Sequence, residues 1–272
     1  MLRGLGPLLR AAHIEPAIAV TLAATALAVG VGLGGRSLLV ALAVGSGQLS
    51  IGWSNDWLDW RRAVDRGRSD KPVARNQISP RAVAVSATVA LLVCVVASVA
   101  LGIASALAHL IGVAAGWLYN LRAKLTWYSV APWAVAFALL PAVVTLATPL
   151  ERWPAWWMIA AGGLLGSGAH FANVLPDLER DRAVGVAGLP HRLGRAGALW
   201  TTVVLVGTGI ALVVVGSAPG PLAWAVGLGG AIALLAIAIA AARGYERLAF
   251  RGVAGLLLLL AVGLVAGSTA LY

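Results

Sequence analysis

The sequence is poor in charged residues and in cysteine. Only 11% of its 272 residues are charged, whereas 60% are hydrophobic, and the mean hydropathy is +0.90. A soluble globular domain does not need such an excess of apolar surface. The single cysteine, Cys94, excludes a disulfide within one chain and argues against a metal-thiolate site. The composition therefore predicts a membrane protein that crosses the bilayer several times.

Long apolar stretches follow one another along the whole chain. A helix that spans a bilayer needs about 20 mostly apolar residues, and nine stretches fit, at residues 16–34, 37–54, 81–101, 103–120, 128–148, 154–175, 198–216, 221–242 and 252–271. The first lacks a clear cleavage site and is followed at once by another span, so we expect it to be retained. No Pro/Ser-rich linker divides the chain. We therefore expect an all-α polytopic membrane protein that forms one domain, residues 1–272.

The basic residues are distributed unevenly. The formal net charge is +10. If the N-terminus is cytoplasmic and the nine spans alternate in direction, every basic residue except Arg36 and Arg152 lies on the cytoplasmic side of the membrane. This bias follows the positive-inside rule, so we expect no nucleic-acid partner. We expect the chain to lie in the inner or plasma membrane with its N-terminus in the cytoplasm. The longer polar loops 55–80, 119–127 and 176–197 then form a cap on the cytoplasmic side.

Acidic residues are scarce and clustered. Of the ten in the chain, seven lie within residues 55–70 and 177–181. Carboxylates near membrane depth are costly, so they indicate a functional site. Helix residues three or four apart share a face, which groups the oxygen-bearing side chains into two motifs: Asn55, Asp56 and Asp59, and Asn173, Asp177 and Asp181. Each motif follows an even-numbered span, so both face the same side, as in a weak internal duplication.

Cations accompany both acidic motifs. Carboxylate and amide oxygens suit Mg²⁺, which is usually bound by a few carboxylates together with substrate phosphates. Carboxylates alone would also suit a cation pathway, but arginine binds phosphate oxygens bidentately. The cations beside the motifs are Arg61, Arg62, Arg66, Arg68, Lys71, Arg122, Lys124, Arg180 and Arg182. The combination favours a metal-bridged isoprenoid diphosphate whose tail enters an apolar cavity.

In these motifs the sequence resembles the UbiA superfamily of intramembrane prenyltransferases. The shared features are nine spans, Asn-Asp-x-x-Asp after the second span, a Tyr…Lys loop after the fourth, and Asn-x-x-x-Asp-x-x-x-Asp after the sixth. The resemblance implies a ring of helices around a central cavity, and Mg²⁺-dependent prenyl transfer from an isoprenoid diphosphate to an aromatic or lipid acceptor. It implies metal ligation by Asp56, Asp59, Asp177 and Asp181, and diphosphate binding by Asn55, Arg68, Lys71, Tyr119, Lys124 and Asn173.

The sequence departs from the family at one position and leaves other functions open. The commoner first motif has a third Asp where this chain has Ala63, and Asp65, six residues beyond Asp59, is interpreted as an arginine partner. The same residues would also serve an intramembrane terpene cyclase, in which an internal double bond captures the cation. A cation-coupled transporter is the alternative from another class. The acceptor, the prenyl chain length and the oligomeric state stay open.

Histidines near the motifs also allow more than one interpretation. His170 either faces the cavity or makes a packing hydrogen bond between helices, and His109 is expected to be structural. His13 and Glu15 precede the first span, where an interfacial turn is the favoured interpretation. Gly162 and Gly166 have the GxxxG spacing that predicts close packing of two helices.

Overall fold

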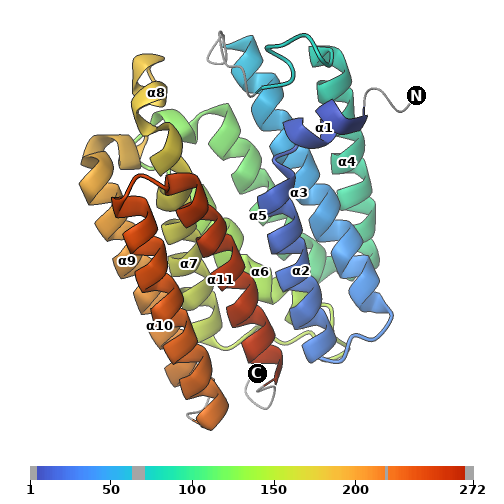
Figure 1. Cartoon of the computed structure of the whole chain (residues 1–272). Helices are drawn as coiled ribbons and strands as arrows, with labels where there is room; N and C mark the ends of the chain where they lie inside the picture. The colour runs from blue at the N-terminus through green and yellow to red at the C-terminus, as the bar shows by residue number, and fades with distance from the viewer. Residues whose placement is uncertain (1–4, 63–70, 218–219, 267–272) are drawn as a thin grey trace.

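The computed structural model of the protein describes residues 5–62, 71–217 and 220–266, which form helices and connecting turns without a strand (Figure 1). The helices are α1 (Leu5–Ala11), α2 (Ile14–Gly30), α3 (Arg36–Arg61), α4 (Pro80–Ala100), α5 (Ile103–Leu121), α6 (Ala131–Thr145), α7 (Trp156–Val174), α8 (Leu178–Ala183), α9 (Leu189–Gly216), α10 (Pro221–Ala242) and α11 (Glu246–Ala266). Two 3-10 turns, η2 (Ala123–Leu125) and η3 (Leu175–Asp177), lie between them.

The predicted all-α membrane architecture is confirmed. The nine predicted spans correspond to α2–α7 and α9–α11. Within the described residues, six helices are long and apolar enough to cross a membrane, while α2 and α6 are shorter apolar helices. Three predicted boundaries are wrong by six residues or more. The helix α3 continues through the first motif to Arg61. The helix α9 begins at Leu189, nine residues before the predicted start at 198, and α11 begins at Glu246, six residues before the predicted start at 252.

Local sequence explains where several helices begin and bend. The Ser79 hydroxyl accepts a hydrogen bond from the amide of Ala82, and Pro80 occupies the first turn of α4, a favourable start for a helix. Within α9, Gly194 has a φ of 73°, which only glycine adopts easily, and the helix kinks there. This kink separates the polar first turns of α9 from its apolar span.

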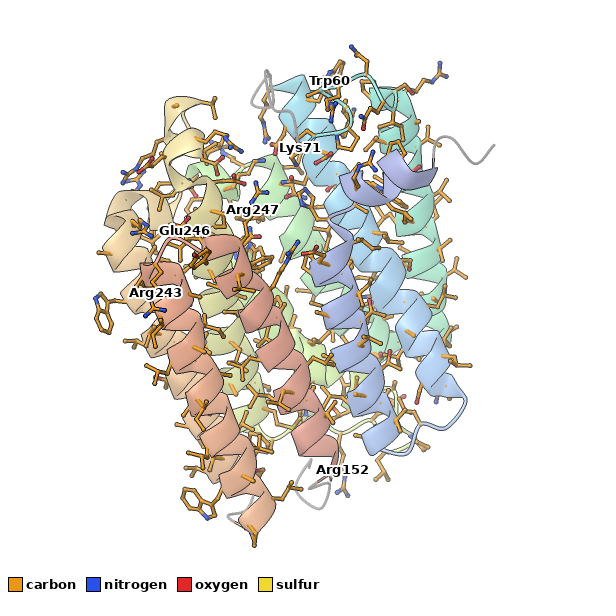
Figure 2. The ribbon with its side chains drawn as sticks, in the orientation of Figure 1. Trp60, Lys71, Arg152, Arg243, Glu246 and Arg247 are labelled. Atoms are coloured by element: carbon orange, nitrogen blue, oxygen red, sulfur yellow. The ribbon has the colours of Figure 1, made fainter. Side chains whose placement is uncertain are left out.

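The long helices form a bundle with α1 lying across one end (Figure 1). We call this the motif end, because it carries α1, Lys71 and α8 (Figures 1 and 2). Arg152 lies at the opposite end, as Figure 2 shows. At that end Arg36 donates hydrogen bonds to the carbonyls of Ala147 and Leu101, at 2.9 and 2.8 Å, and so ties the ends of three helices together.

Small residues let α6 and α7 approach closely. A Cβ atom added to Gly162 would lie 2.4 Å from the Phe137 carbonyl oxygen, and one added to Gly166 would lie 2.4 Å from the Phe137 Cβ. No side chain fits at either position, so the predicted close packing at the GxxxG motif is confirmed. The contact also holds Phe137 in a wall of the central cavity.

Candidate active site

A deep cavity lies inside the bundle and opens near both acidic motifs. Its volume is about 640 Å³, within the range usual for small-molecule sites. Its walls come mainly from α2, α3, α5, α6, α7 and α11, and Arg10 of α1 and Val213 of α9 also line it. Along α11 the lining runs from Arg247 to Ala261, about 21 Å at the rise of an α-helix. Asn55 and Asn173 contribute to the wall near the motif end, whereas Leu27, Trp157 and Met158 are apolar lining residues further along.

The first motif lies on the last turns of α3 and points in two directions. Asn55 donates a hydrogen bond to the Asn120 side chain, at 3.1 Å, and faces the cavity. Asp56 is only 1% exposed and forms an ion pair with Lys71. His13 Nε2 lies 3.3 Å from Asp56 Oδ1 and 3.0 Å from Lys71 Nζ. The motif therefore separates into a cavity face with Asn55 and a buried cluster around Asp56.

Asp59 forms a second buried ion pair. It binds Lys124 of η2, and the two side chains are 10% and 7% exposed. Burial lowers the pKa of Lys124 below the ordinary lysine value, an effect larger than the opposite influence of the Asp59 carboxylate. Lys124 also lies in the electrostatic field of Lys71. The two lysines of the chain therefore sit together, each beside a carboxylate of the first motif.

The second motif follows the end of α7. Asn173 lines the cavity from the last turn of this helix, and Pro176 lies within the 3-10 turn η3 that interrupts the helical path. Asp177 forms an ion pair with Arg180 at 3.1 Å. Asp181 Oδ2 lies 3.5 Å from Nε2 of His191, a side chain that is only 4% exposed. Both carboxylates stay partly accessible, unlike those of the first motif.

Tyr119 connects the two motifs. It lines the cavity from the last turn of α5, and both Asp59 and Asp181 are close enough to act electrostatically on its hydroxyl. Carboxylates from α3 and from α8 therefore approach the same tyrosine. The structure thus brings together the motifs that lie about 120 residues apart in the sequence.

Aromatic rings line the cavity beneath the motifs. Trp133 and Phe137 stack with ring centroids 6.1 Å apart, and Tyr119 and Trp133 form a T-shaped pair with ring centroids 5.9 Å apart. His170 supports this group from behind: it is 1% exposed, packs 5.4 Å from Tyr119, and shares a hydrogen bond of 3.0 Å with Ser129. This geometry favours the packing interpretation of His170.

His109 is also part of the helix packing. It shares a hydrogen bond of 2.7 Å with Ser98, between α4 and α5.

Some residues of the site were not expected from the sequence, and one expected residue is not described. His13, interpreted as part of an interfacial turn, reaches the buried cluster around Asp56, and its φ of 52° is unusual for a residue other than glycine. Asn120 holds Asn55 while donating to Ser54 and to the Ile51 carbonyl. Only tertiary contacts reveal both roles. The predicted diphosphate ligand Arg68 lies outside the described residues, as does Asp65.

The donor set can be compared with what Mg²⁺ requires. Among the described residues, no three His, Cys, Asp or Glu side chains lie together as a complete metal cluster. The available groups are nevertheless carboxylates and amides, and Mg²⁺ often takes only one or two carboxylates, completing its shell with water and substrate phosphate. Asp56 Oδ2 is buried, and no residue in the described part of the chain donates a hydrogen bond to it. A cation would satisfy this acceptor. The residues therefore fit a metal held jointly with a phosphate.

Solved structures with the same fold come from several proteins. A UbiA homologue from Aeropyrum pernix K1, without ligand, aligns with a TM-score of 0.73 at 18% identity, over 91% of this chain and 97% of that chain. A homologue from Archaeoglobus fulgidus bound to GPP and Mg²⁺ aligns with a TM-score of 0.70 at 18% identity, over 96% and 99% of the two chains. A digeranylgeranylglyceryl phosphate synthase aligns with a TM-score of 0.66 at 16% identity, over 98% and 99%.

The fold defines an α-helical integral membrane protein with an apolar cavity that ends in a polar rim. No curated protein matches the chain in sequence. The family model of the UbiA prenyltransferase family, however, matches residues 17–251. The chain belongs to the UbiA prenyltransferase family, which confirms the resemblance carried by the two motifs.

Proposed function

We propose that the protein is a Mg²⁺-dependent prenyltransferase that moves a prenyl group from an isoprenoid diphosphate to an aromatic or lipid acceptor within the membrane. The observation that carries the proposal is the apolar cavity that is lined near its mouth by Asn55, Asn173 and Tyr119. Asp59 and Asp181, one carboxylate from each motif, lie close to that tyrosine. Such a shape suits an amphiphile with a charged head and a long apolar tail. The family assignment supports the same reaction class.

The metal-binding groups in this proposal are Asp56, Asp59, Asp177 and Asp181, with Asn55 and Asn173 beside them. Bound Mg²⁺ would act as a Lewis acid that stabilises the negative charge of the departing diphosphate. Support comes from the donor chemistry and from the similar A. fulgidus homologue, which was solved with GPP and Mg²⁺. Asp59 is held by Lys124 and Asp56 by Lys71, so these ammonium groups would have to turn from the carboxylates toward the diphosphate.

Several side chains would bind and orient the donor. Lys71 and Lys124 supply positive charge beside the first motif, and we assign Arg68, outside the described residues, to the same role. Tyr119 lies between the motifs, in reach of both sets of charges. Below it, the faces of Trp133 and Phe137 would stabilise the allylic cation left when the C1–O bond breaks. The apolar wall keeps water away from that cation.

The remaining parts of the proposal concern the acceptor and the membrane. The cavity of about 640 Å³ has to hold the prenyl tail and the acceptor together. When the new bond to the prenyl C1 forms, the acceptor loses a proton. We place the motif end in the cytoplasm of a cell whose inner or plasma membrane holds the protein, because the basic residues follow the positive-inside rule.

One experiment tests the reaction class directly. Purified protein in a lipid bilayer is incubated with Mg²⁺ and prenyl diphosphates of several lengths, with and without aromatic and lipid acceptors, and products are identified by mass. We expect a prenylated acceptor and free diphosphate, both absent when EDTA is added. Diphosphate release with a cyclic hydrocarbon and no acceptor would assign the protein as a terpene cyclase. Cation movement across sealed vesicles, without diphosphate cleavage, would indicate a transporter.

A further inference from the structure

Asp181 differs from the other three motif carboxylates in the group that lies beside it. Asp56 forms an ion pair with Lys71, Asp59 with Lys124, and Asp177 with Arg180. Within the described part of the chain, no lysine or arginine forms an ion pair with Asp181. The imidazole of His191 lies there instead, with Nε2 3.5 Å from Asp181 Oδ2. A lysine or an arginine therefore neutralises three carboxylates, whereas a histidine faces the fourth.

The His191 side chain is buried and its ring nitrogens are unpaired. It is 4% exposed, and neither ring nitrogen has a hydrogen-bond partner among the described residues. Buried polar atoms nearly always have such a partner, and a carboxylate can only accept a hydrogen bond. A proton on Nε2 would therefore be donated to Asp181 once the two atoms approach to the usual distance of about 3.0 Å. Hydrogen bonds in active sites are often long without ligand and shorten when it binds.

The chain between α8 and α9 holds His191 beside Asp181. Arg182 donates a hydrogen bond to the carbonyl of His191. The kink at Gly194 lies next to the same guanidinium group, 3.9 Å from the position of an added Cβ atom. The amide of Val186 donates a hydrogen bond of 2.9 Å to the carbonyl of Asp181. These contacts close a compact connection that brings the start of α9 back to α8.

The start of α9 is also fixed on its other side. The amide of Leu189 donates a hydrogen bond of 2.9 Å to the Ser129 hydroxyl. A Cβ atom added to Gly188 would lie 2.9 Å from that hydroxyl and 2.9 Å from the Lys124 carbonyl oxygen, so no side chain fits there. The segment that carries His191 is thus packed against the loop that carries Lys124. Asp181, in contrast, belongs to α8, a helix of only six residues (Figure 1).

We propose that His191 is a positioning residue, whose Nε2–H group holds the Asp181 carboxylate in the orientation that binds Mg²⁺. The inference rests on the proposed function, because the metal role of Asp181 is part of it. Groups that hydrogen-bond to a metal ligand orient that ligand, and their removal typically weakens metal binding or activity about 10- to 100-fold. His191 acts through Asp181 and does not contact the metal or the substrate.

The test uses His191→Leu with His109→Leu as its matched control. His109 is also buried, at 6% exposed, but its hydrogen bond goes to Ser98 between α4 and α5. Binding of magnesium pyrophosphate to the full chain in phosphatidylcholine nanodiscs is measured by titration calorimetry. We expect His191→Leu to bind it about 10- to 100-fold more weakly than wild type and His109→Leu to bind it like wild type. Equal weakening in both variants would overturn the proposal in favour of a general effect of losing a buried histidine.

Two further variants separate positioning from packing. His191→Gln keeps an N–H donor near the end of the side chain and should recover most of the lost affinity. Asp181→Asn/His191→Leu should bind magnesium pyrophosphate no more weakly than Asp181→Asn alone, because coupled residues are not additive. If the loss of His191 weakens binding equally in both backgrounds, it does not act through Asp181. Thermal unfolding confirms that each variant is folded, and His191→Ala, which cannot clash with its surroundings, replaces the leucine variant if that protein does not fold.

Binding and prenyl transfer together separate this inference from the proposed function. If wild type and His191→Leu bind magnesium pyrophosphate equally, the positioning role is wrong while the proposed function stands. If His191→Leu binds it more weakly but wild type transfers no prenyl group to any acceptor, the positioning role holds and the proposed function fails. If wild type does not bind magnesium pyrophosphate, the metal assignment and the positioning role fail together.

Discussion

Replacing Lys124 with methionine tests whether the metal and the lysine compete for Asp59. In the structure the two side chains form an ion pair and are 7% and 10% exposed. Removing one partner of a buried pair leaves the other charge uncompensated, at a cost of about 3–5 kcal/mol. For a protein of this size, 1 kcal/mol corresponds to roughly 2–4 °C in Tm. We therefore expect Lys124→Met to lower the Tm of the metal-free protein by about 6–20 °C.

Mg²⁺ should have the opposite effect on the variant. If Asp59 is a metal ligand, a metal has to displace the ammonium of Lys124 from it in the wild type, whereas in Lys124→Met the carboxylate is already available. We expect Mg²⁺ alone to bind the variant at least 10-fold more tightly, a difference of about 1.4 kcal/mol, and to recover much of the lost Tm. Under the proposed function, the KM for the prenyl diphosphate should rise, because the variant lacks the ammonium group assigned to the phosphate oxygens.

Titration calorimetry with Mg²⁺ and thermal unfolding of the same samples measure both effects. Arg251→Met is the control, since its ion pair with Glu15 is 61% and 58% exposed and exposed pairs contribute about 0–1 kcal/mol. The double variant Asp59→Asn/Lys124→Met should recover stability, because removing both charges of a buried pair is often neutral. If Mg²⁺ binds Lys124→Met no more tightly than wild type, Asp59 is not a metal ligand.

Four further substitutions test other parts of the protein. Asp177→Ala should abolish diphosphate release with little change in Tm. Asp56→Ala should abolish it too and also lower the Tm, because Lys71 stays buried without its partner. An assay of released diphosphate and thermal unfolding measure the two effects, and near-normal turnover in both variants would contradict the metal assignment. Trp157→Ala should lower the free energy of unfolding by about 3–5 kcal/mol and shift the preference for the donor toward longer prenyl chains. Competition between donors of different lengths measures this preference. If the preference is unchanged, Trp157 does not contact the prenyl tail. Gly162→Val should lower the Tm, since a Cβ would lie 2.4 Å from a carbonyl oxygen of α6, and normal stability would contradict this packing.

Apolar length predicts most helices of this protein because a bilayer span needs a minimum number of apolar residues. The predicted span 221–242 agrees with α10. The end of α3 was predicted too early because hydropathy falls at Asn55, yet the helix continues to Arg61. Its polar side chains find partners inside the bundle, such as Asn120 for Asn55 and Lys124 for Asp59. Tertiary contacts of this kind supply the hydrogen bonds and ion pairs that water would otherwise supply to the polar side chains at a helix end.

Helical spacing predicts which residues of a motif share a face, but it does not identify their neighbours. Asn55 and Asp59 are four apart, while Asp56 points instead to His13 and Lys71. His13 lies 43 positions before Asp56, so only the packing of α1 and α2 against α3 brings them together. The metal and diphosphate roles of these residues stay predictions. What the packing explains is why an N-terminal turn belongs to the site.

The proposed function gives the cations around the first motif two uses, and charge balance connects them. Without a metal, a carboxylate removed from water is stable only beside a positive group, and Lys71 and Lys124 fill that position for Asp56 and Asp59. A metal-bound diphosphate brings its own positive and negative charge, so the carboxylates would pair with the metal and the lysines with the phosphates. Each of these charged groups then has a partner both before and after binding. Under the proposed function, the site could therefore exchange a highly charged ligand without exposing unpaired charge to the apolar cavity.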